Sequence, residues 1–141
     1  MAFIRWGSHL ATGHQEIDEQ HRTLIDTFNR LEAVAARGPS NHEELEGLLI
    51  FLRNFALAHF RMEQELMARH RYPAETEHRR LHTDLAAQLE AILDAYHKGT
   101  TLVSPVTLEY LDAWLSKHIQ EEDFRLAEFL NQAQAEERGQ A

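Results

Sequence analysis

The sequence predicts an all-α fold, an up-down-up-down four-helix bundle preceded by an N-terminal arm. Apolar residues recur at intervals of three and four in four segments, as expected for helices that bury one face. Short turn signals separate the segments, and helices of roughly 20 to 30 residues joined by short turns pack side by side. The turn signals are Gly38-Pro39, Tyr72-Pro73, Gly99 and Ser104-Pro105.

A chain of 141 residues fits one domain with its own hydrophobic core. Residues 1–16 show no sustained period and form the expected arm, with Trp6 among the aromatic residues that would pack on the bundle. Residues 17–131 form the expected bundle, and residues 132–141 form a polar C-terminal tail.

The first two helices each carry polar residues in an otherwise apolar interior stripe. The first stripe comprises Ile17, His21, Leu24, Phe28, Leu31 and Ala35. Residues Ser40 to Glu43 have the Ser-x-x-Glu form of a capping box, which predicts the start of the second helix. That helix should end before Pro73, because proline disfavours helix at the preceding residue. The second stripe comprises Leu45, Leu48 or Leu49, Leu52, Phe55, His59, Met62 or Glu63, and Leu66.

The third and fourth helices also carry histidine where an apolar residue is expected. The third helix should begin near Pro73 and end at Gly99. The fourth should begin at Pro105 after an N-cap at Ser104, since proline is well tolerated at the first helical position. The third stripe comprises His78, His82, Leu85, Leu89, Ile92 and Tyr96. The fourth comprises Leu108, Leu111, Leu115, His118, Glu122, Leu126 and Phe129.

The composition argues against several function classes. The chain has no cysteine, which excludes thiolate metal sites. A formal net charge of −9 argues against nucleic-acid binding, which needs a concentrated basic surface. The N-terminus lacks the continuous apolar run of a signal peptide, and no segment approaches the roughly 20 apolar residues that span a bilayer. We therefore expect a cytoplasmic protein without membrane insertion.

Five histidines and at least one carboxylate from all four helices face the same predicted interior. His59 and Glu63 are four residues apart, as are His78 and His82, so each pair lies on one helix face. Burying such groups without partners costs about 1 to 3 kcal/mol each. A hydrogen-bond network explains any single histidine but leaves nitrogens of the whole set unpaired. Imidazole with carboxylate suits iron, copper or zinc, and the set exceeds the four ligands of one zinc, so a two-metal centre is predicted.

Several stretches give the chain a resemblance to bacterial hemerythrins over most of its length. They are Trp6, Ile17-Asp18-Glu19-Gln20-His21, His59-Phe60-Arg61-Met62-Glu63, Tyr72-Pro73 with His78 and His82, and Trp114-Leu115-Ser116-Lys117-His118-Ile119 with Asp123. The resemblance implies a non-haem di-iron centre. In it, one iron would be held by His78, His82 and His118 and the other by His21 and His59. Glu63, Asp123 and a solvent-derived oxygen would bridge the two irons.

The resemblance also implies a function. The iron with two histidines has one position left open, where dioxygen would bind. We therefore expect reversible dioxygen binding for carriage, storage or delivery, with a protein recipient that the sequence does not identify. The alternatives are oxygen or redox sensing through a partner protein, di-iron oxidase or peroxidase activity, and storage of iron as cargo. An enzyme is not expected, although a weak oxidase or peroxidase side activity is compatible with such a centre.

Helical spacing and the resemblance disagree over the last metal ligand. Asp123 follows His118 by five residues, about 140° around an ideal helix, whereas Glu122 at four residues is better aligned. The family pattern favours Asp123, and a local π-helical turn would reconcile its spacing. The resemblance further implies an apolar pocket at the open position, lined by Leu24, Phe60, Trp114, Leu115 and Ile119.

Overall fold

A computed structural model describes residues 6–37, 42–99 and 105–139. Within these ranges every regular element is helical, as expected. None of the helices in the described ranges is long and apolar enough to cross a membrane. The elements are η1 (Ser8–Leu10), α1 (Gln15–Ala36), α2 (His42–His70), α3 (Glu75–His97), α4 (Pro105–Lys117), η3 (His118–Asp123) and α5 (Phe124–Gly139).

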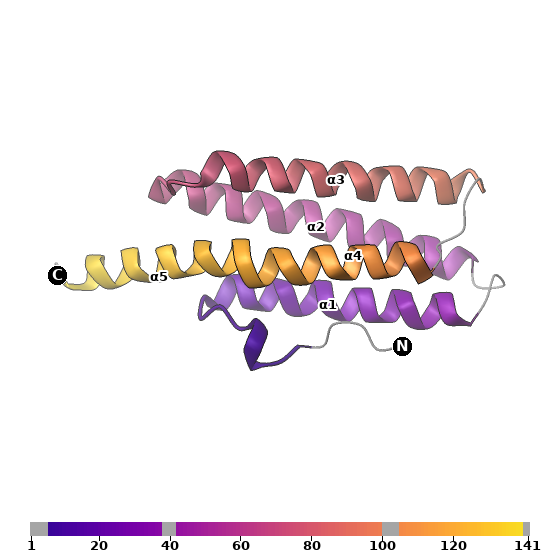
Figure 1. The fold of residues 1–141 in the computed structure, drawn as a ribbon, viewed down its shortest axis with the longest axis horizontal. Coiled ribbons are helices and arrows are strands. Elements are labelled where there is room, and N and C mark those ends of the chain that lie inside the picture. Colours follow the sequence, from indigo (N-terminus) through magenta and orange to yellow (C-terminus); the bar gives the residue numbers. More distant parts are fainter. Residues whose placement is uncertain (1–5, 38–41, 100–104, 140–141) are drawn as a thin grey trace.

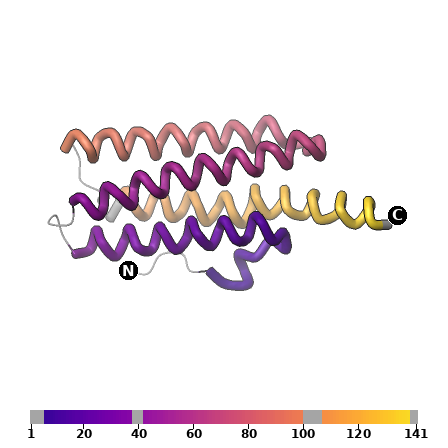
Figure 2. Tube along the Cα trace, turned by 180° about the vertical axis from the view of Figure 1, so that it is seen from behind, coloured from indigo at the N-terminus to yellow at the C-terminus, as the bar shows by residue number. Residues whose placement is uncertain are grey.

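The helices form an antiparallel bundle of four rods (Figure 1). The fourth rod consists of α4, η3 and α5 in one continuous helix, and η3 is its π-helical part. Chain direction alternates from rod to rod, which confirms the predicted up-down-up-down arrangement. The view from behind shows the end of α5 projecting beyond the other helices (Figure 2). The polar tail expected from residue 132 is thus helical as far as Gly139.

The turn between α2 and α3 depends on a left-handed residue. Arg71 has φ of 54°, and the amide of Tyr72 donates to the carbonyl of Met67 at 2.9 Å. This arrangement satisfies a carbonyl at the end of α2 and turns the chain toward α3. The helix therefore ends just before Pro73, as the sequence predicts. The expected caps Ser40 and Ser104 lie outside the described residues.

Replacing Arg71 with glycine is expected to stabilise the protein. Glycine adopts positive φ without the steric cost that a Cβ imposes, so we expect a gain of about 0.5 to 1 kcal/mol. Thermal unfolding monitored by circular dichroism measures this gain. The matched control is Arg69→Gly, because Arg69 is also exposed but lies inside α2, where glycine costs about 1 kcal/mol. Equal destabilisation by both variants would contradict the left-handed assignment.

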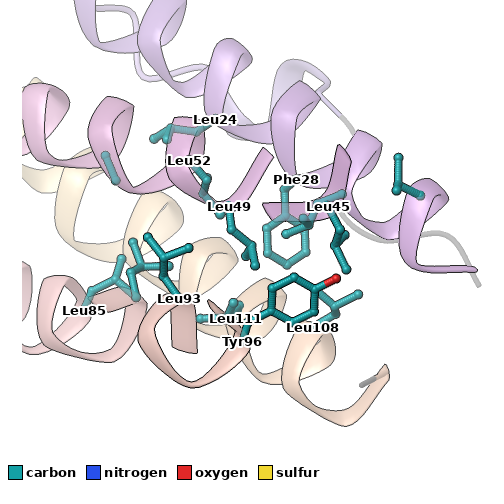
Figure 3. Packing of buried hydrophobic residues seen from close by; sticks show 14 of the residues in the cluster. Leu24, Phe28, Leu45, Leu49, Leu52, Leu85, Leu93, Tyr96, Leu108 and Leu111 are labelled. Atoms are coloured by element: carbon teal, nitrogen blue, oxygen red, sulfur yellow. The ribbon is translucent and has the colours of Figure 1, made fainter. Parts of the chain in front are cut away.

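Two apolar clusters fill the bundle on either side of a polar layer. The larger cluster contains Leu24 and Phe28 of α1 and apolar side chains of α2, α3 and α4. These side chains point toward one another in Figure 3. The smaller comprises Ile17, Met67, Leu126, Ala127 and Leu130. On α1, His21 lies between Ile17 of the smaller cluster and Leu24 of the larger one. The layer of histidines and carboxylates therefore lies between two apolar regions of the core.

The N-terminal arm packs against α1 and the fourth rod. Leu10 is buried with Ile25 and Ile119. Asp18 accepts hydrogen bonds from the amide of Thr12 at 2.9 Å and from its hydroxyl at 2.7 Å. These bonds join the arm to the first turn of α1 and hold Leu10 against the π-helical segment.

Candidate metal centre

Seven polar side chains from all four rods meet in the middle of the bundle. Each is at most 4% exposed, although each is a histidine, a glutamate or an aspartate. They are His21 from α1, His59 and Glu63 from α2, His78 and His82 from α3, and His118 and Asp123 from η3. The structure thus brings together all the residues that the sequence predicts as ligands. Their ligand atoms form two groups that share both carboxylates.

The first group contains three histidines. Oε1 of Glu63 lies 3.1 Å from Nε2 of His78 and 3.0 Å from Nε2 of His82. Oδ1 of Asp123 lies 3.0 Å from Nε2 of His78 and 3.0 Å from Nε2 of His118. One oxygen of each carboxylate therefore faces two of the three imidazoles, and both oxygens face His78.

The second group contains two histidines and the other oxygen of each carboxylate. Oδ2 of Asp123 lies 2.7 Å from Nε2 of His21 and 3.7 Å from Nε2 of His59. Oε2 of Glu63 lies 3.3 Å from Nε2 of His59. Each carboxylate thus spans the two groups with one oxygen in each, which is the arrangement of a bridging ligand between two ions.

Many of these close contacts do not have the geometry of hydrogen bonds. Buried atoms without a hydrogen-bond partner include Nε2 of His59, His82 and His118, Oε2 of Glu63 and Oδ1 of Asp123. Leaving such atoms unpaired costs about 1 to 3 kcal/mol each. Two ligands at right angles around one ion, each bonded at about 2.1 Å, lie about 3.0 Å apart. The contact distances of 3.0 and 3.1 Å match that spacing, so the donor set fits metal ions.

The electrostatics show how the carboxylates act on the histidines. Burial lowers the pKa of His59, but the negative charges of Glu63 and Asp123 close to its Nε2 outweigh burial and raise the pKa to about 10. The pKa of His78 rises to about 9 by the same competition between burial and the two carboxylates. Burial dominates at His82 and lowers its pKa. Metal ions in the cluster would take the place of the protons on His59 and His78, so binding should release protons.

The two carboxylates stay ionised despite their burial. Burial raises the pKa of Asp123, but the charge of His118, the hydrogen bond with His21 and the nearby ring of His59 hold it well below the usual range. Burial and the Asp123 charge raise the pKa of Glu63, yet His59 and His78 more than offset them and lower it. Two buried negative charges so close together require positive charge beside them, which either protonated imidazoles or metal ions provide.

The π-helical segment η3 places Asp123, and not Glu122, in the buried cluster. A π turn closes hydrogen bonds between residues five apart, so His118 and Asp123 take the relation that residues four apart have in an α-helix. Asp123 is fully buried in the cluster. The side chain of Glu122 is 23% exposed and lies near Arg125 on the surface. The interior position that ideal helical spacing assigns to Glu122 is therefore wrong.

An apolar cavity adjoins the two-histidine side of the cluster. The centre of a water-sized sphere can move through about 30 Å³ of it. Its walls include His21 and His59 of the two-histidine group, together with His118 and Asp123, but not His78, His82 or Glu63. The remaining lining residues are apolar and come from all four rods: Leu24, Phe28, Leu52, Ala56, Phe60, Leu85, Leu89, Leu111, Trp114 and Leu115.

The expected pocket residues are found at this cavity with one exception. Ile119 is buried against Leu10 and Ile25, on the side of η3 that faces the arm. The resemblance, and not helical spacing, predicts Ile119 at the pocket; in the structure its side chain packs with the arm instead. Trp114 stacks on the ring of His118 with centroids 4.6 Å apart, and Phe60 stacks on His82 at 4.1 Å.

Two glutamines beside the cluster were not among the predicted site residues. Oε1 of Gln20 lies 2.6 Å from Nδ1 of His59, and Nε2 of Gln64 lies 3.5 Å from Nδ1 of His82. Each glutamine is the sequence neighbour of a predicted ligand, Gln20 of His21 and Gln64 of Glu63. That adjacency was the available signal, because a side chain next to a ligand can reach a histidine on the facing helix.

Fold and site together define a class of protein: a four-helix bundle with a buried histidine–carboxylate cluster able to hold metal ions. The model of the hemerythrin HHE cation-binding domain matches residues 12–130. The chain therefore belongs to the hemerythrin family.

Individual relatives agree with this assignment. The bacteriohemerythrin of Methylococcus capsulatus is 28% identical over 124 residues, which cover 87% of this chain and 93% of the relative. A hemerythrin-like protein of Naegleria gruberi is 28% identical over 122 residues, covering 86% of this chain and 89% of that protein. The crystal structure of a wild-type hemerythrin superposes with a TM-score of 0.85 at 26% identity, over 92% of this chain and 98% of that one.

Proposed function

We propose that this protein binds dioxygen reversibly at a non-haem di-iron centre held by the seven buried side chains. The observation that carries the proposal is the division of the cluster into two groups that share both carboxylates. A pair of ferrous ions could lend two electrons to bound dioxygen and recover them when it leaves. Imidazole and carboxylate are suitable ligands for iron, and the family model is that of a cation-binding domain.

The unequal donor sets support binding at one particular position. His78, His82 and His118 supply three nitrogens to the first group, whereas His21 and His59 supply only two to the second. If Glu63, Asp123 and a solvent-derived oxygen bridge both ions, an octahedral ion in the second group would have five ligands and one position left. The apolar cavity touches both histidines of that group and so lies where a small ligand would arrive.

The cavity favours binding over oxidation chemistry. Its titratable lining residues in the described part of the chain are members of the cluster itself, so no separate acid or base adjoins the cavity there. Leu24, Phe60 and Trp114 are among its apolar walls, which disfavour the entry of water. A dry site slows proton delivery to a bound ligand and thereby its irreversible loss. Carriage, storage or delivery of dioxygen is the use that such a site suits best.

An oxygen titration tests the proposal. The iron-loaded protein is reduced under argon, and its visible absorbance is followed while oxygen pressure is raised and then lowered. We expect a change that saturates with oxygen and reverses when oxygen is removed. Rapid conversion to an oxidised form with release of peroxide would instead indicate an oxidase and contradict the proposal.

Variants of the two-histidine group locate the binding position. His21→Ala and His59→Ala are each expected to abolish the reversible absorbance change, because each removes one of only two nitrogens from the proposed oxygen-binding iron. His97→Ala is the matched control, since His97 is exposed, pairs with Glu46 and is not part of the cluster. Undiminished oxygen binding in either cluster variant would show that the position is wrongly assigned.

A further inference from the structure

Gln20 makes the shorter of the two glutamine contacts with the cluster. Its Oε1 lies 2.6 Å from Nδ1 of His59, and the contact joins α1 to α2. The other ring nitrogen of His59, Nε2, faces Glu63 and Asp123. The imidazole is therefore held between an amide oxygen on one side and the cluster on the other.

The chemistry of the amide oxygen determines where the imidazole proton lies. A carbonyl oxygen only accepts hydrogen bonds, so Nδ1 of His59 must carry the hydrogen that it donates to Gln20. A neutral His59 then has its lone pair on Nε2, the nitrogen that faces the cluster. Accepting the Nδ1 hydrogen also makes the imidazole a stronger electron donor to an ion bound at Nε2.

Gln64 does not do the same for the three-histidine group. Its contact with Nδ1 of His82 is 3.5 Å long and is made by the amide nitrogen, which is a donor. An N–H group that donates to Nδ1 of His82 needs a lone pair on that nitrogen, so it does not favour the tautomer whose lone pair is on Nε2 and available to an ion. His82 and His59 thus belong to different groups and differ in how their outer nitrogens are held.

We propose that Gln20 is a positioning residue that sets the tautomer and basicity of His59 and so makes the two metal positions electronically unequal. This inference rests on the proposed di-iron function. Gln20 strengthens the hold of the two-histidine group on its ion and favours the ferric over the ferrous state there. The two-histidine group, which would receive dioxygen, has one nitrogen fewer than the other group, and the stronger donation by His59 compensates for this difference.

Iron release under argon tests the inference without using oxygen. Reduced protein is mixed with a ferrous chelator, and the two irons are followed as separate phases. In Gln20→Leu, which removes the acceptor at similar size, we expect one phase to accelerate about 10- to 100-fold and the other to stay at the wild-type rate. Gln20→Glu keeps an acceptor at this position, so it should release iron at the wild-type rate or more slowly.

The reduction potential is a second readout. If Gln20 had only a structural role, Gln20→Leu and Gln20→Glu would not shift the potential in opposite directions. Gln20→Leu should raise the potential by about 59 mV for each tenfold loss of preference for the ferric ion, and Gln20→Glu should lower it. Gln15→Leu is the matched control and should leave both readouts near wild type, because Gln15 lies on the same helix but is exposed and contacts Glu19 instead of a histidine of the cluster. Gln20 is only partly buried, and thermal unfolding of the metal-free variants verifies that the fold is intact.

The outcomes separate this inference from the proposed function. Wild-type release rates in Gln20→Leu, or equal acceleration in Gln15→Leu, would overturn the role of Gln20. A wild-type protein that holds two irons but does not bind oxygen reversibly would refute the proposed function and leave the role of Gln20 to these measurements. A wild-type protein that holds fewer than two irons would refute both.

Discussion

Asp123→Ala is expected to lose both irons, whereas Glu122→Ala, one residue earlier, is expected to keep them. Asp123 places one oxygen beside His78 and His118 and the other beside His21. Its removal therefore takes a ligand from both metal positions at once. Even partners that only hydrogen-bond to ligands contribute about 10- to 100-fold to metal affinity, so loss of a shared ligand should cost at least about 100-fold.

Elemental analysis of the two variants after purification from iron-replete cells measures this difference. Glu122 is a stringent control because it lies on the same turn, carries the same charge and is the residue that ideal helical spacing would choose. Its side chain lies near Arg125 instead of entering the cluster. Iron loss in Glu122→Ala together with full occupancy in Asp123→Ala would refute the assignment of the π-helical segment.

Removal of the metal is expected to lower the thermal midpoint of unfolding by about 10 °C near neutral pH. An ion present at 1,000 times its dissociation constant stabilises the folded state by about 4 kcal/mol. For a chain of this size 1 kcal/mol corresponds to about 2 to 4 °C. Differential scanning calorimetry of iron-loaded and chelator-treated protein measures the gap. Identical midpoints would mean that no ion is bound at the cluster.

The same gap should widen as pH rises, and the pKa shifts determine the sign. In metal-free protein the folded-state pKa values of His59 and His78 are about 10 and about 9, above the usual 6.5. Their stabilisation is fully present below pH 6.5 and is lost as pH rises through 9 and 10. Bound iron needs no proton on either ring, so the loaded protein should keep its stability over that range.

The acid side has the opposite sign. The pKa values of Glu63 and Asp123 are depressed, so their contribution is present above the ordinary carboxyl range and is lost as pH falls below it. Protons also compete with iron for the same nitrogens, and loaded protein should release its metal in acid. Metal-free Asp123→Asn tests the origin of the alkaline effect. Without that charge, stability should be lost at lower pH than in metal-free wild type, and an unchanged alkaline transition would contradict the pairing.

Much of the fold follows from periodicity and turn residues. The apolar stripes place His21, His59 and His78 in the interior because helical residues three or four apart share a face, and the structure buries each of them. The alternatives that spacing left open in α2 are also decided, since Leu49 and Glu63 are buried while Leu48 and Met62 are only partly so.

Periodicity fails at the point where the helix is not ideal. A π-helical segment brings Asp123, five residues after His118, into the cluster, where helical spacing favours Glu122. No residue type marks such a segment, because its extra hydrogen-bond register is maintained by packing around it. The contact of Gln20 with His59 also depends on how α1 and α2 lie against each other, which a pattern within one helix does not report.

Anomalous diffraction at the iron absorption edge from crystals of iron-loaded protein tests the central claim most directly. Two peaks are expected within the buried cluster, with Glu63 and Asp123 between them. One should lie beside His78, His82 and His118, and the other beside His21 and His59. A single peak, no peak, or iron bound only outside these residues would contradict a di-iron centre in this bundle.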